Sequence, residues 1–337
     1  MSYDLIAATM FVSMLLLLGT GQRVFGAIGF VAATAALLLW GDGGSNMPFA
    51  GASKLQDWYA LTTVPMFVLM GYVLAESGIA GDLYRMFHVW MGGIRGGLAI
   101  GTIGLMVLIS VINGLSIAGM AIGATIALPE LLRRGYDKLM VTGVIQAGST
   151  LGILIPPSVV LVLYAMIARQ PVDQLWIAGI MPGLMLATIF TLYIAIRCWF
   201  QPHLGPALPK AERNIPMKEK LRLLGVGLVP LLVFGVMIGL FVTGITSLVE
   251  SSAVGASAAI LAAALKGRLT RALLESTFTK TMDITVMFMW IILAALCFGA
   301  VFDGLGAVKA IERFFLEDLD LSPWEVLILM QVSFLIM

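Results

Sequence analysis

The feature that most constrains the fold is an interrupted apolar run at residues 139–168, LMVTGVIQAGSTLGILIPPSVVLVLYAMIA. Near its centre stand Gly148-Ser149-Thr150-Leu151-Gly152 and then Pro156-Pro157-Ser158, where a membrane helix is expected to stay regular. In hydrocarbon every backbone amide and carbonyl needs a partner, so irregular backbone persists only where it is buried in protein or lines a wet cavity. Unwound carbonyls and half-helix ends at that depth are ready ligands for ions and substrates. We therefore expect a functional break between residues 148 and 158.

Composition places the chain among polytopic membrane proteins, because 60% of its 337 residues are hydrophobic and only 12% are charged. The net charge of +1 gives no basic excess that would indicate nucleic-acid binding. Cys198 and Cys297 lie in separate apolar runs, so neither a disulfide framework nor a metal site is indicated. The N-terminal apolar stretch lacks a basic region and a cleavage site, and we interpret it as a retained first span. The expected fold class is all-α.

A span needs about 20 apolar residues at the helical rise of 1.5 Å per residue. This rule predicts apolar segments near 5–21, 24–40, 64–84, 139–168, 174–197, 223–243, 246–265, 281–302 and 324–337. The stretch 97–128 is too long for one ordinary span and too short for two, and Asn113-Gly114 lies near its midpoint. We expect a re-entrant hairpin with two half-length limbs that meet at a polar tip.

The distribution of basic residues independently favours re-entry at 97–128. With the N-terminus outside, sixteen of the 20 Lys and Arg residues fall on the cytoplasmic side, and the four outside are Lys54, Arg169, Lys309 and Arg313. Cytoplasmic loops carry such an excess in membrane proteins. Making 97–128 a full span would reverse every basic loop downstream of it. The sequence thus predicts a periplasmic N-terminus.

The segment 201–222 carries four prolines and dense charge, which predicts a cytoplasmic linker between two halves. The second half has an amphipathic segment at 303–320 but neither a second hairpin nor a second broken helix. The chain stops inside an apolar run without polar or charged residues that normally end a span. We therefore expect a truncated chain.

The hairpin tip at 112–116 and the break at 148–158 supply the same chemistry. Both offer small hydroxyl or amide side chains and exposed carbonyls, a set of oxygens that suits a dehydrated hard cation such as Na⁺. The alternative is that Gly and Ser only permit close helix packing; we favour this alternative for Gly101, Gly104, Gly119 and Gly123. The cation interpretation is favoured for Asn113, Ser116, Ser149 and the Pro-Pro-Ser element, because two prolines remove two donors and cost a helix several kcal/mol.

The string GYDKLMVTGVIQAGSTLGILIPPSVVLVLYAMIARQPV, preceded by NGLSIAGMAIGA, resembles the large membrane subunit of the tripartite ATP-independent periplasmic (TRAP) transporters, the DctM-like family. Further similar stretches are TTVPMFVLMGYVLAESGIAGDLY at 62–84 and ITSLVESSAVGA at 245–256. The resemblance covers nearly the whole chain, and the Gly-Ser-x-x-Gly-Ile-x-Ile-Pro-Pro-Ser pattern is its most specific part. The chain departs from the family pattern at Gly21–Val24 and Thr246–Glu250, so a substrate subclass is not inherited.

This resemblance implies an elevator-type, Na⁺-coupled importer in the bacterial inner membrane. Its expected partners are a small membrane subunit, a periplasmic substrate-binding protein, a small carboxylate substrate and the lipid bilayer. By motif, the Na⁺ or substrate site involves Asn113, Gly114, Ser116, Ser149, Thr150, Gly152, Pro156, Pro157 and Ser158, with Na⁺ itself held through Asn113, Ser116, Ser149, Gly152 and Ser158. The family's second hairpin and second Pro-Pro helix lie beyond Met337.

The implied organisation is an inverted repeat whose second half is incomplete. Residues 1–96 would form N-terminal scaffold spans and 97–200 the first transport half, with its hairpin at 97–128, broken helix at 139–168 and span at 174–197. Residues 201–222 would be the linker, and 223–337 the scaffold spans and the start of a second transport half.

Other polar and aromatic residues receive structural interpretations. Glu250 is expected to hydrogen-bond neighbouring backbone or close a gap, and Glu76 and Asp82 to lie at a helix end and in a loop. Six tryptophans fall near predicted span ends, as in an aromatic belt: Trp40, Trp58, Trp90, Trp176, Trp199 and Trp324.

Alternatives to the TRAP interpretation remain open. One is a related dicarboxylate/Na⁺ symporter of the elevator type that needs no binding protein, and another is a non-transporting fragment with a structural or assembly role. An intramembrane enzyme would need a metal cluster, a serine with a base or paired carboxylates. The sequence contains no HExxH, no GxSxG and no acidic pair on one helix face, so we expect no enzyme, no catalytic residue and no cofactor besides Na⁺ as the coupling ion.

Overall fold

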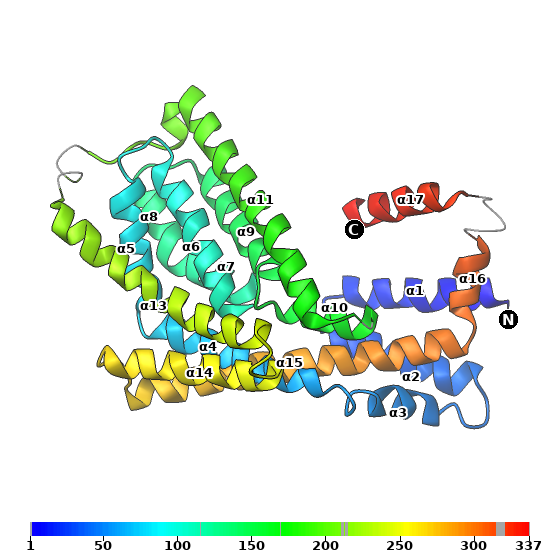
Figure 1. Cartoon of the computed structure of the whole chain (residues 1–337). Helices are drawn as coiled ribbons and strands as arrows, with labels where there is room; N and C mark the ends of the chain where they lie inside the picture. Colours follow the sequence, from blue (N-terminus) through cyan, green and yellow to red (C-terminus); the bar gives the residue numbers. More distant parts are fainter. Residues whose placement is uncertain are drawn as a thin grey trace. The chain divides into compact units, whose positions relative to one another are not determined.

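The fold is entirely helical over the residues that the computed structural model describes, 2–114, 116–168, 170–209, 212, 215–314 and 321–336 (Figure 1). The predicted all-α class is confirmed. Within this described part, five helical stretches are long and apolar enough to cross a membrane: Tyr59–Glu76, Val172–Phe200, Met217–Val242, Leu248–Leu265 and Arg271–Gly304. The bent pair α9 (Lys138–Leu154) and α10 (Val159–Ala168) makes a sixth if it counts as one span.

The chain divides into two compact units, residues 60–285 and the remainder, 1–59 with 286–337. The second of these contains α1 (Tyr3–Gly19), α2 (Val24–Leu39), α3 (Asn46–Ser53), the end of α15 (Arg271–Gly304), α16 (Ala307–Arg313) and α17 (Pro323–Ile336). Its buried core is made of small and aliphatic side chains, namely Ile6, Met10, Val31, Ala32, Ala35, Ala36, Val301 and Leu305. The predicted amphipathic segment 303–320 is helical over α16, and residues 315–320 lie outside the described part.

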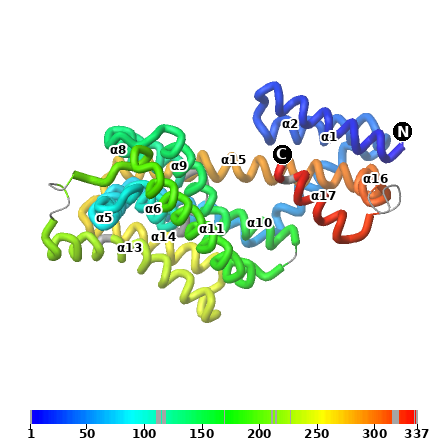
Figure 2. Tube along the Cα trace, turned by 90° about the horizontal axis from the view of Figure 1, so that it is seen from above, coloured from blue at the N-terminus to red at the C-terminus, as the bar shows by residue number. Residues whose placement is uncertain are grey.

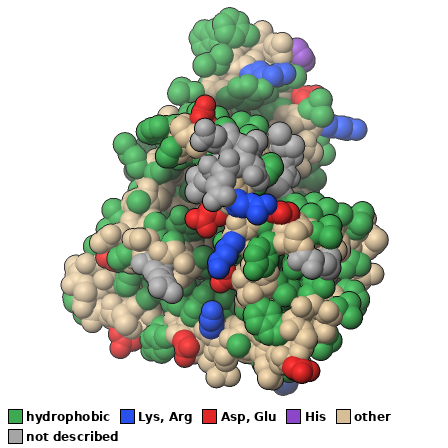
Figure 3. All heavy atoms as spheres, turned by 90° about the vertical axis from the view of Figure 1, so that its right-hand side faces the viewer, with side chains coloured by type: hydrophobic (Ala, Val, Ile, Leu, Met, Phe, Trp, Pro, Cys, Tyr) green, Lys and Arg blue, Asp and Glu red, His purple; other side chains and the backbone are tan. Residues whose placement is uncertain are grey.

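Hydrophobic side chains also cover much of the face shown in Figure 3. On the smaller unit, Leu38 and Leu335 are 80% and 88% exposed. Water-soluble proteins avoid large apolar surfaces of this kind, whereas a bilayer accepts them.

The larger unit holds both irregular elements of the sequence. Its helices are α4 (Thr63–Glu76), α5 (Ile79–Met91), α6 (Gly97–Asn113), α7 (Ser116–Ile122), α8 (Leu128–Arg133), α9, α10, α11 (Val172–Phe200), α13 (Met217–Val242), α14 (Leu248–Leu265) and the start of α15. A short π-helix, Gly123–Ala127, joins α7 to α8, and a 3₁₀ turn, Pro202–Leu204, follows α11. Helices α6, α9 and α11 pack side by side (Figures 1 and 2), and α7 lies against α9.

The two ends of the hairpin meet at one end of this unit. The amide of Leu98, at the start of α6, donates to the Tyr136 hydroxyl at 3.3 Å, just beyond α8. The chain after α11 closes the same end, because Gly96 donates to the carbonyl of Gly205 at 2.8 Å and Asp137 to that of Leu204 at 3.1 Å. The segment 97–128 therefore begins and ends at neighbouring positions, as a pair of antiparallel limbs does.

The predicted bounds of the span 64–84 are wrong, because the apolar stretch Tyr59–Glu76 ends with α4 at Glu76 and α5 begins at Ile79. Gly78 adopts a left-handed conformation with φ of +75°, which stops the helix as a glycine commonly does just past a C-terminus. The Arg268 guanidinium donates to the carbonyl of Ser77 at 2.7 Å and pairs with Asp82 at 3.2 Å. An apolar window misses this stop, since the residues on both sides of it are hydrophobic.

Three acidic residues, Glu76, Asp82 and Glu250, have structural contacts. Glu76 ends α4 as expected and pairs with Lys280. Asp82 is not in a loop but in the first turn of α5, where it pairs with Arg268 and Lys266. Glu250 forms a capping box with Ser247 at the start of α14: its carboxylate accepts from the Ser247 amide at 2.7 Å. The structural interpretation of Glu250 is confirmed.

Two further segment boundaries differ from those predicted. The predicted linker 201–222 is shorter, because α13 already begins at Met217. Helix α15 begins at Arg271, ahead of the predicted start at 281. In both cases charged residues extend an apolar helix into its polar end, so a rule based on apolar length places the boundary too far inward.

Candidate functional site

The hairpin tip contacts the helix break directly. Gly114 stands between α6 and α7 with φ of +60°, and its carbonyl oxygen accepts the Val159 amide hydrogen at 3.2 Å. A Cβ atom on Gly114 would lie only 2.1 Å from the carbonyl oxygen of Pro157. A glycine is therefore required here on two grounds, the left-handed conformation and the close approach of two backbones.

The break is caused by the two prolines. A residue before a proline is pushed out of the helical region, and Ile155 accordingly has φ of −81° and ψ of 123° directly after α9. Pro156 and Pro157, joined by a cis peptide bond, are both buried. Among the described residues, no hydrogen bond reaches the carbonyl oxygens of Ile155, Pro156 and Pro157. The break thus presents main-chain oxygens without hydrogen-bond partners in that part of the chain.

Ser158 ends the break and caps α10. Its Oγ donates to the carbonyl oxygen of Ile153 at 2.6 Å and accepts the amide hydrogen of Leu161 at 3.2 Å. The side chain is fully buried. The Ser158 carbonyl oxygen accepts the indole hydrogen of Trp176 at 3.4 Å, so α11 also supports the break.

Trp176 is a residue whose role the sequence interpretation missed. It is 2% exposed and packs against the rings of Phe67 and Phe241, with centroids 5.7 and 5.3 Å away. The aromatic-belt interpretation is therefore wrong for this tryptophan. A buried indole N–H normally finds a hydrogen-bond partner, but the sequence carries no signal that this one is buried.

The irregular segment is shorter than the predicted 148–158. Gly148 to Gly152 lie within the regular helix α9, and only Ile155 to Ser158 depart from it. Glycine and serine weaken a helix by a fraction of a kcal/mol to about 1 kcal/mol each, whereas proline costs about 3 kcal/mol. Packing keeps the small residues helical: a Cβ on Gly148 would lie 2.7 Å from Cγ of Met106 on α6.

The hydroxyl groups of Ser149 and Thr150 are hydrogen-bonded within α9. Ser149 Oγ donates to the carbonyl of Gln146 at 2.8 Å, and Thr150 Oγ1 donates to that of Ala147 at 2.7 Å. Ser149 is 2% exposed, and a Cβ atom on Gly119 of α7 would lie 3.9 Å from its Cα, whereas Thr150 is exposed. A hydroxyl oxygen that donates its hydrogen keeps its lone pairs for a cation. Ser149 thus lies at the contact between α9 and the second limb.

Two predicted ligands can be located only by their main chain. Asn113 is the last residue of α6 and Ser116 the first of α7, on either side of Gly114. Their side chains and the whole of Leu115 lie outside the described residues. The structure therefore brings together Gly114 and the Pro156–Ser158 segment, while the ligand roles of Asn113 and Ser116 stay predictions.

The donors described at this site are neutral oxygens. Within the described part of the chain, no group of three or more His, Cys, Asp or Glu side chains is placed to hold a metal ion. Hydroxyl and carbonyl oxygens are ligands that suit hard cations.

Comparison with known proteins extends this picture. The profile of the family described as "Tripartite ATP-independent periplasmic transporter, DctM component" matches residues 11–337. A C4-dicarboxylate TRAP transporter large permease protein DctM from Pseudomonas aeruginosa is 32% identical over 84% of this chain and 65% of its own length. An ectoine/5-hydroxyectoine TRAP transporter large permease protein from Ruegeria pomeroyi is 31% identical over 56% of this chain and 45% of its own length.

A third relative joins two subunit names in one protein. The isethionate TRAP transporter permease protein DctMQ from Oleidesulfovibrio alaskensis is 26% identical over 47% of this chain and 25% of its own length. These relatives are transporter permeases rather than enzymes. The chain spans 65% or less of the length of each of the three.

Proposed function

Because the chain belongs to the DctM component family of TRAP transporters, we propose that it is the large membrane subunit of a Na⁺-coupled importer of small organic acids. The observation that carries this proposal is the contact between the Gly114 hairpin tip and the Pro156–Ser158 break. It places two interrupted helices against each other inside a multi-pass membrane protein. Ion and substrate sites of secondary transporters form at such interruptions.

In this proposal Na⁺ is a transported substrate that binds between the tip and the break. Main-chain oxygens of the break and the Ser149 hydroxyl replace water around the ion, and Ser158 contributes its remaining lone pair. Asn113 and Ser116 add oxygens from the hairpin side, and Gly114, Thr150, Gly152, Pro156 and Pro157 complete the site. The hydrogen bond from Val159 to Gly114 supports it by holding the two elements together.

We also propose a periplasmic N-terminus in the bacterial inner membrane. The excess of basic residues supports this orientation, and two ion pairs agree with the grouping of segments by side, because each joins segments assigned to the same side. Arg85 pairs with Glu219 at 3.1 Å on the proposed cytoplasmic side. Asp4 pairs with Arg313 at 3.2 Å on the proposed periplasmic side.

The family resemblance supports the further proposal that transport uses an elevator motion. The first transport half, residues 97–200, would move with a second transport half, which begins within 223–337, past scaffold spans from 1–96 and from the earlier part of 223–337. The partners proposed for it are a small membrane subunit and a periplasmic binding protein. The fused name of the Oleidesulfovibrio relative supports a close association of the two membrane subunits. The relatives are named for C4-dicarboxylates and ectoine, which supports a small organic solute as the substrate.

The proposal is tested by uptake into proteoliposomes. The full-length gene product is reconstituted with its small subunit, and the binding protein, loaded with a labelled ligand, is added outside. We expect uptake under an inward Na⁺ gradient and none when choline replaces Na⁺. Ser149→Ala should abolish it, whereas Ser252→Ala should not, since Ser252 is an equally buried serine with the same local hydrogen bond on α14.

Two results would contradict the proposal. Equal uptake in Na⁺ and choline would remove Na⁺ coupling, and equal uptake without the binding protein would favour a symporter that takes its substrate directly from solution. Both comparisons, Na⁺ against choline and with against without the binding protein, use the same wild-type vesicles. A loss of folding therefore cannot produce either result.

A further inference from the structure

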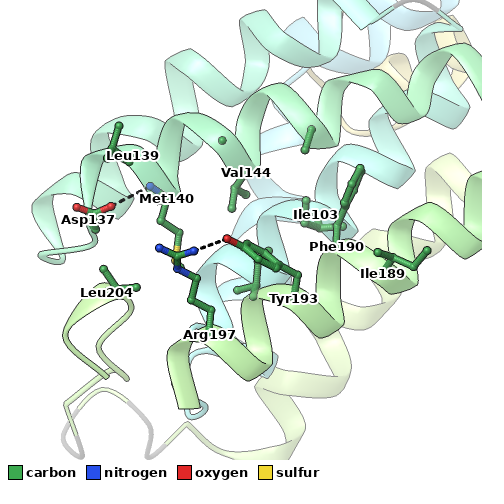
Figure 4. Close-up of a pocket in the computed structure, with 13 residues that line it drawn as sticks. Ile103, Asp137, Leu139, Met140, Val144, Ile189, Phe190, Tyr193, Arg197 and Leu204 are labelled. Atoms are coloured by element: carbon green, nitrogen blue, oxygen red, sulfur yellow. Dashed lines mark hydrogen bonds between the residues drawn. The ribbon is translucent and has the colours of Figure 1, made fainter. Parts of the chain in front are cut away.

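An apolar groove of about 610 Å³ runs along the surface between α9 and α11, with Ile103 of α6 at its floor (Figure 4). Its apolar lining comes mainly from Leu139, Met140, Val144, Ala147, Ile189 and Phe190. Gly143 opens it further, because nothing lies within 4 Å of the position that its Cβ would take. The groove belongs to neither the hairpin tip nor the helix break.

One end of the groove carries an arginine. Figure 4 shows Arg197, Tyr193 and Asp137 toward that end and Ile189 and Phe190 toward the other. The Arg197 guanidinium donates to the Tyr193 hydroxyl at 2.6 Å and lies 5.7 Å from the centre of its ring. Within the described residues Arg197 forms no ion pair, so its charge is not neutralised there.

The nearby carboxylate does not neutralise this charge. Asp137 is the N-cap of α9, and its Oδ1 accepts the amide hydrogen of Met140 at 3.0 Å. This carboxylate is thus directed at the positive end of a helix. Trp199 and Phe200, exposed by 74% and 79%, follow Arg197 on α11, and tryptophan is enriched where membrane helices reach the interface.

We propose that this groove binds one phospholipid with an anionic headgroup. The acyl chain lies along the apolar lining, and the phosphate is held by Arg197, whose planar guanidinium can bind two phosphate oxygens at once. Tyr193 fixes the guanidinium and adds its own hydroxyl. Basic pockets between membrane helices recognise anionic lipids in this way.

A second groove shows why the arginine matters. It measures about 590 Å³ and lies between α5, α6, α11 and α13, where its described lining residues carry no charge. In a bilayer an acyl chain gains little by exchanging lipid for an equally apolar groove. A preference for an anionic headgroup must therefore come from Arg197, which lines the first of these two grooves and not the second.

Two substitutions separate the contribution of the lipid headgroup to binding from that of the acyl chain. Arg197→Gln removes the charge and leaves the apolar lining intact, whereas Gly143→Phe fills the groove and leaves the charge. Their matched controls both lie on α13. Arg222→Gln removes an exposed arginine, and Gly235→Phe adds a phenylalanine at a glycine that, like Gly143, has nothing within 4 Å of its Cβ position.

The test is lipid titration of the purified, delipidated full-length protein, with bound lipid counted by native mass spectrometry. Wild type should bind phosphatidylglycerol more tightly than phosphatidylcholine. Arg197→Gln should weaken phosphatidylglycerol binding by about tenfold, equivalent to about 1.4 kcal/mol, and abolish the preference. Gly143→Phe should weaken both lipids, and both controls should match wild type.

The proposal is overturned if both groove variants bind phosphatidylglycerol as tightly as wild type. It is equally overturned if wild type binds the two lipids alike. A loss in Arg197→Gln without any loss in Gly143→Phe would show that the headgroup binds outside the groove.

Discussion

The Val159 amide donates a hydrogen bond to the Gly114 carbonyl oxygen over 3.2 Å, which joins the first residue of α10 to the tip of the hairpin. This bond replaces one that the proline-interrupted helix cannot make for itself. The same two segments meet at Pro157, whose carbonyl oxygen approaches the α-carbon side of Gly114. The tip and the break are thus one structural element, although they come from separate parts of the chain.

Gly114→Ala should therefore reduce both stability and uptake. A left-handed alanine costs roughly 1–2 kcal/mol, and its Cβ would also collide with the Pro157 carbonyl oxygen. The matched control is Gly135→Ala, since Gly135 has φ of +78° and nothing within 4 Å of its Cβ position. Thermal unfolding in detergent should show the larger loss for Gly114→Ala, and equal losses in the two variants would argue against the close contact.

Ser158→Ala should destabilise the fold by about 1–2 kcal/mol, because it removes the N-cap of α10 and leaves the partly buried Leu161 amide without its acceptor. Ser252→Ala serves as the control. The Ser252 hydroxyl only donates, to the carbonyl of Val249 at 2.6 Å, so its loss leaves no amide unpaired. The thermal midpoint of Ser158→Ala should therefore lie below that of Ser252→Ala. The reverse order would contradict the capping role of Ser158.

The stabilising effect of Glu130 should depend on pH. The Arg133 and Arg134 side chains hydrogen-bond to this carboxylate, which lies in the first turn of α8, and lower its pKa from 4.5 to about 2. Stability from a depressed pKa is present above the unfolded value and lost as the pH falls toward the folded value. The gap in thermal midpoint between wild type and Glu130→Gln should narrow from about pH 5 downward. A constant gap over that range would contradict this prediction.

The proposed orientation predicts which loops face the periplasm. With Cys198 and Cys297 replaced by alanine, a cysteine at the exposed Asp57 should react with a membrane-impermeant thiol reagent in intact spheroplasts. A cysteine at the exposed Gln201 should react only after the membrane is permeabilised. The opposite labelling pattern would contradict the proposed orientation. As a control, both cysteines should react after permeabilisation, which shows that each site is accessible to the reagent.

The elements predicted best from the sequence are those set by strong local rules. Two consecutive prolines cannot continue a helix, so the interruption at Pro156 and Pro157 was predictable. Apolar length likewise predicts most long helices. The stop at Gly78 was missed because hydrophobic residues continue past it, and the cation that stabilises it, Arg268, lies far along the chain.

The errors at the candidate site have a different cause. Gly148 and Ser149 lower helix propensity, but packing against Met106 and Gly119 compensates, and such contacts are not visible in a local pattern. The hydrogen bond between Val159 and Gly114 and that between Trp176 and Ser158 join residues distant in sequence. One sequence alone carries no signal that pairs them. The motif therefore predicts candidate site residues but not which of their atoms are in contact.

The most direct test of a Na⁺ site at the tip and break is ion-dependent stability. A ligand that binds only the folded state raises the unfolding midpoint as its concentration increases. The thermal midpoint of the purified full-length protein is measured while Na⁺ replaces choline at constant ionic strength, for wild type, Ser149→Ala and Ser252→Ala. We predict that Na⁺ raises the midpoint of wild type and Ser252→Ala but not that of Ser149→Ala. An equal Na⁺-dependent rise in all three proteins, or no rise in wild type, would contradict the site.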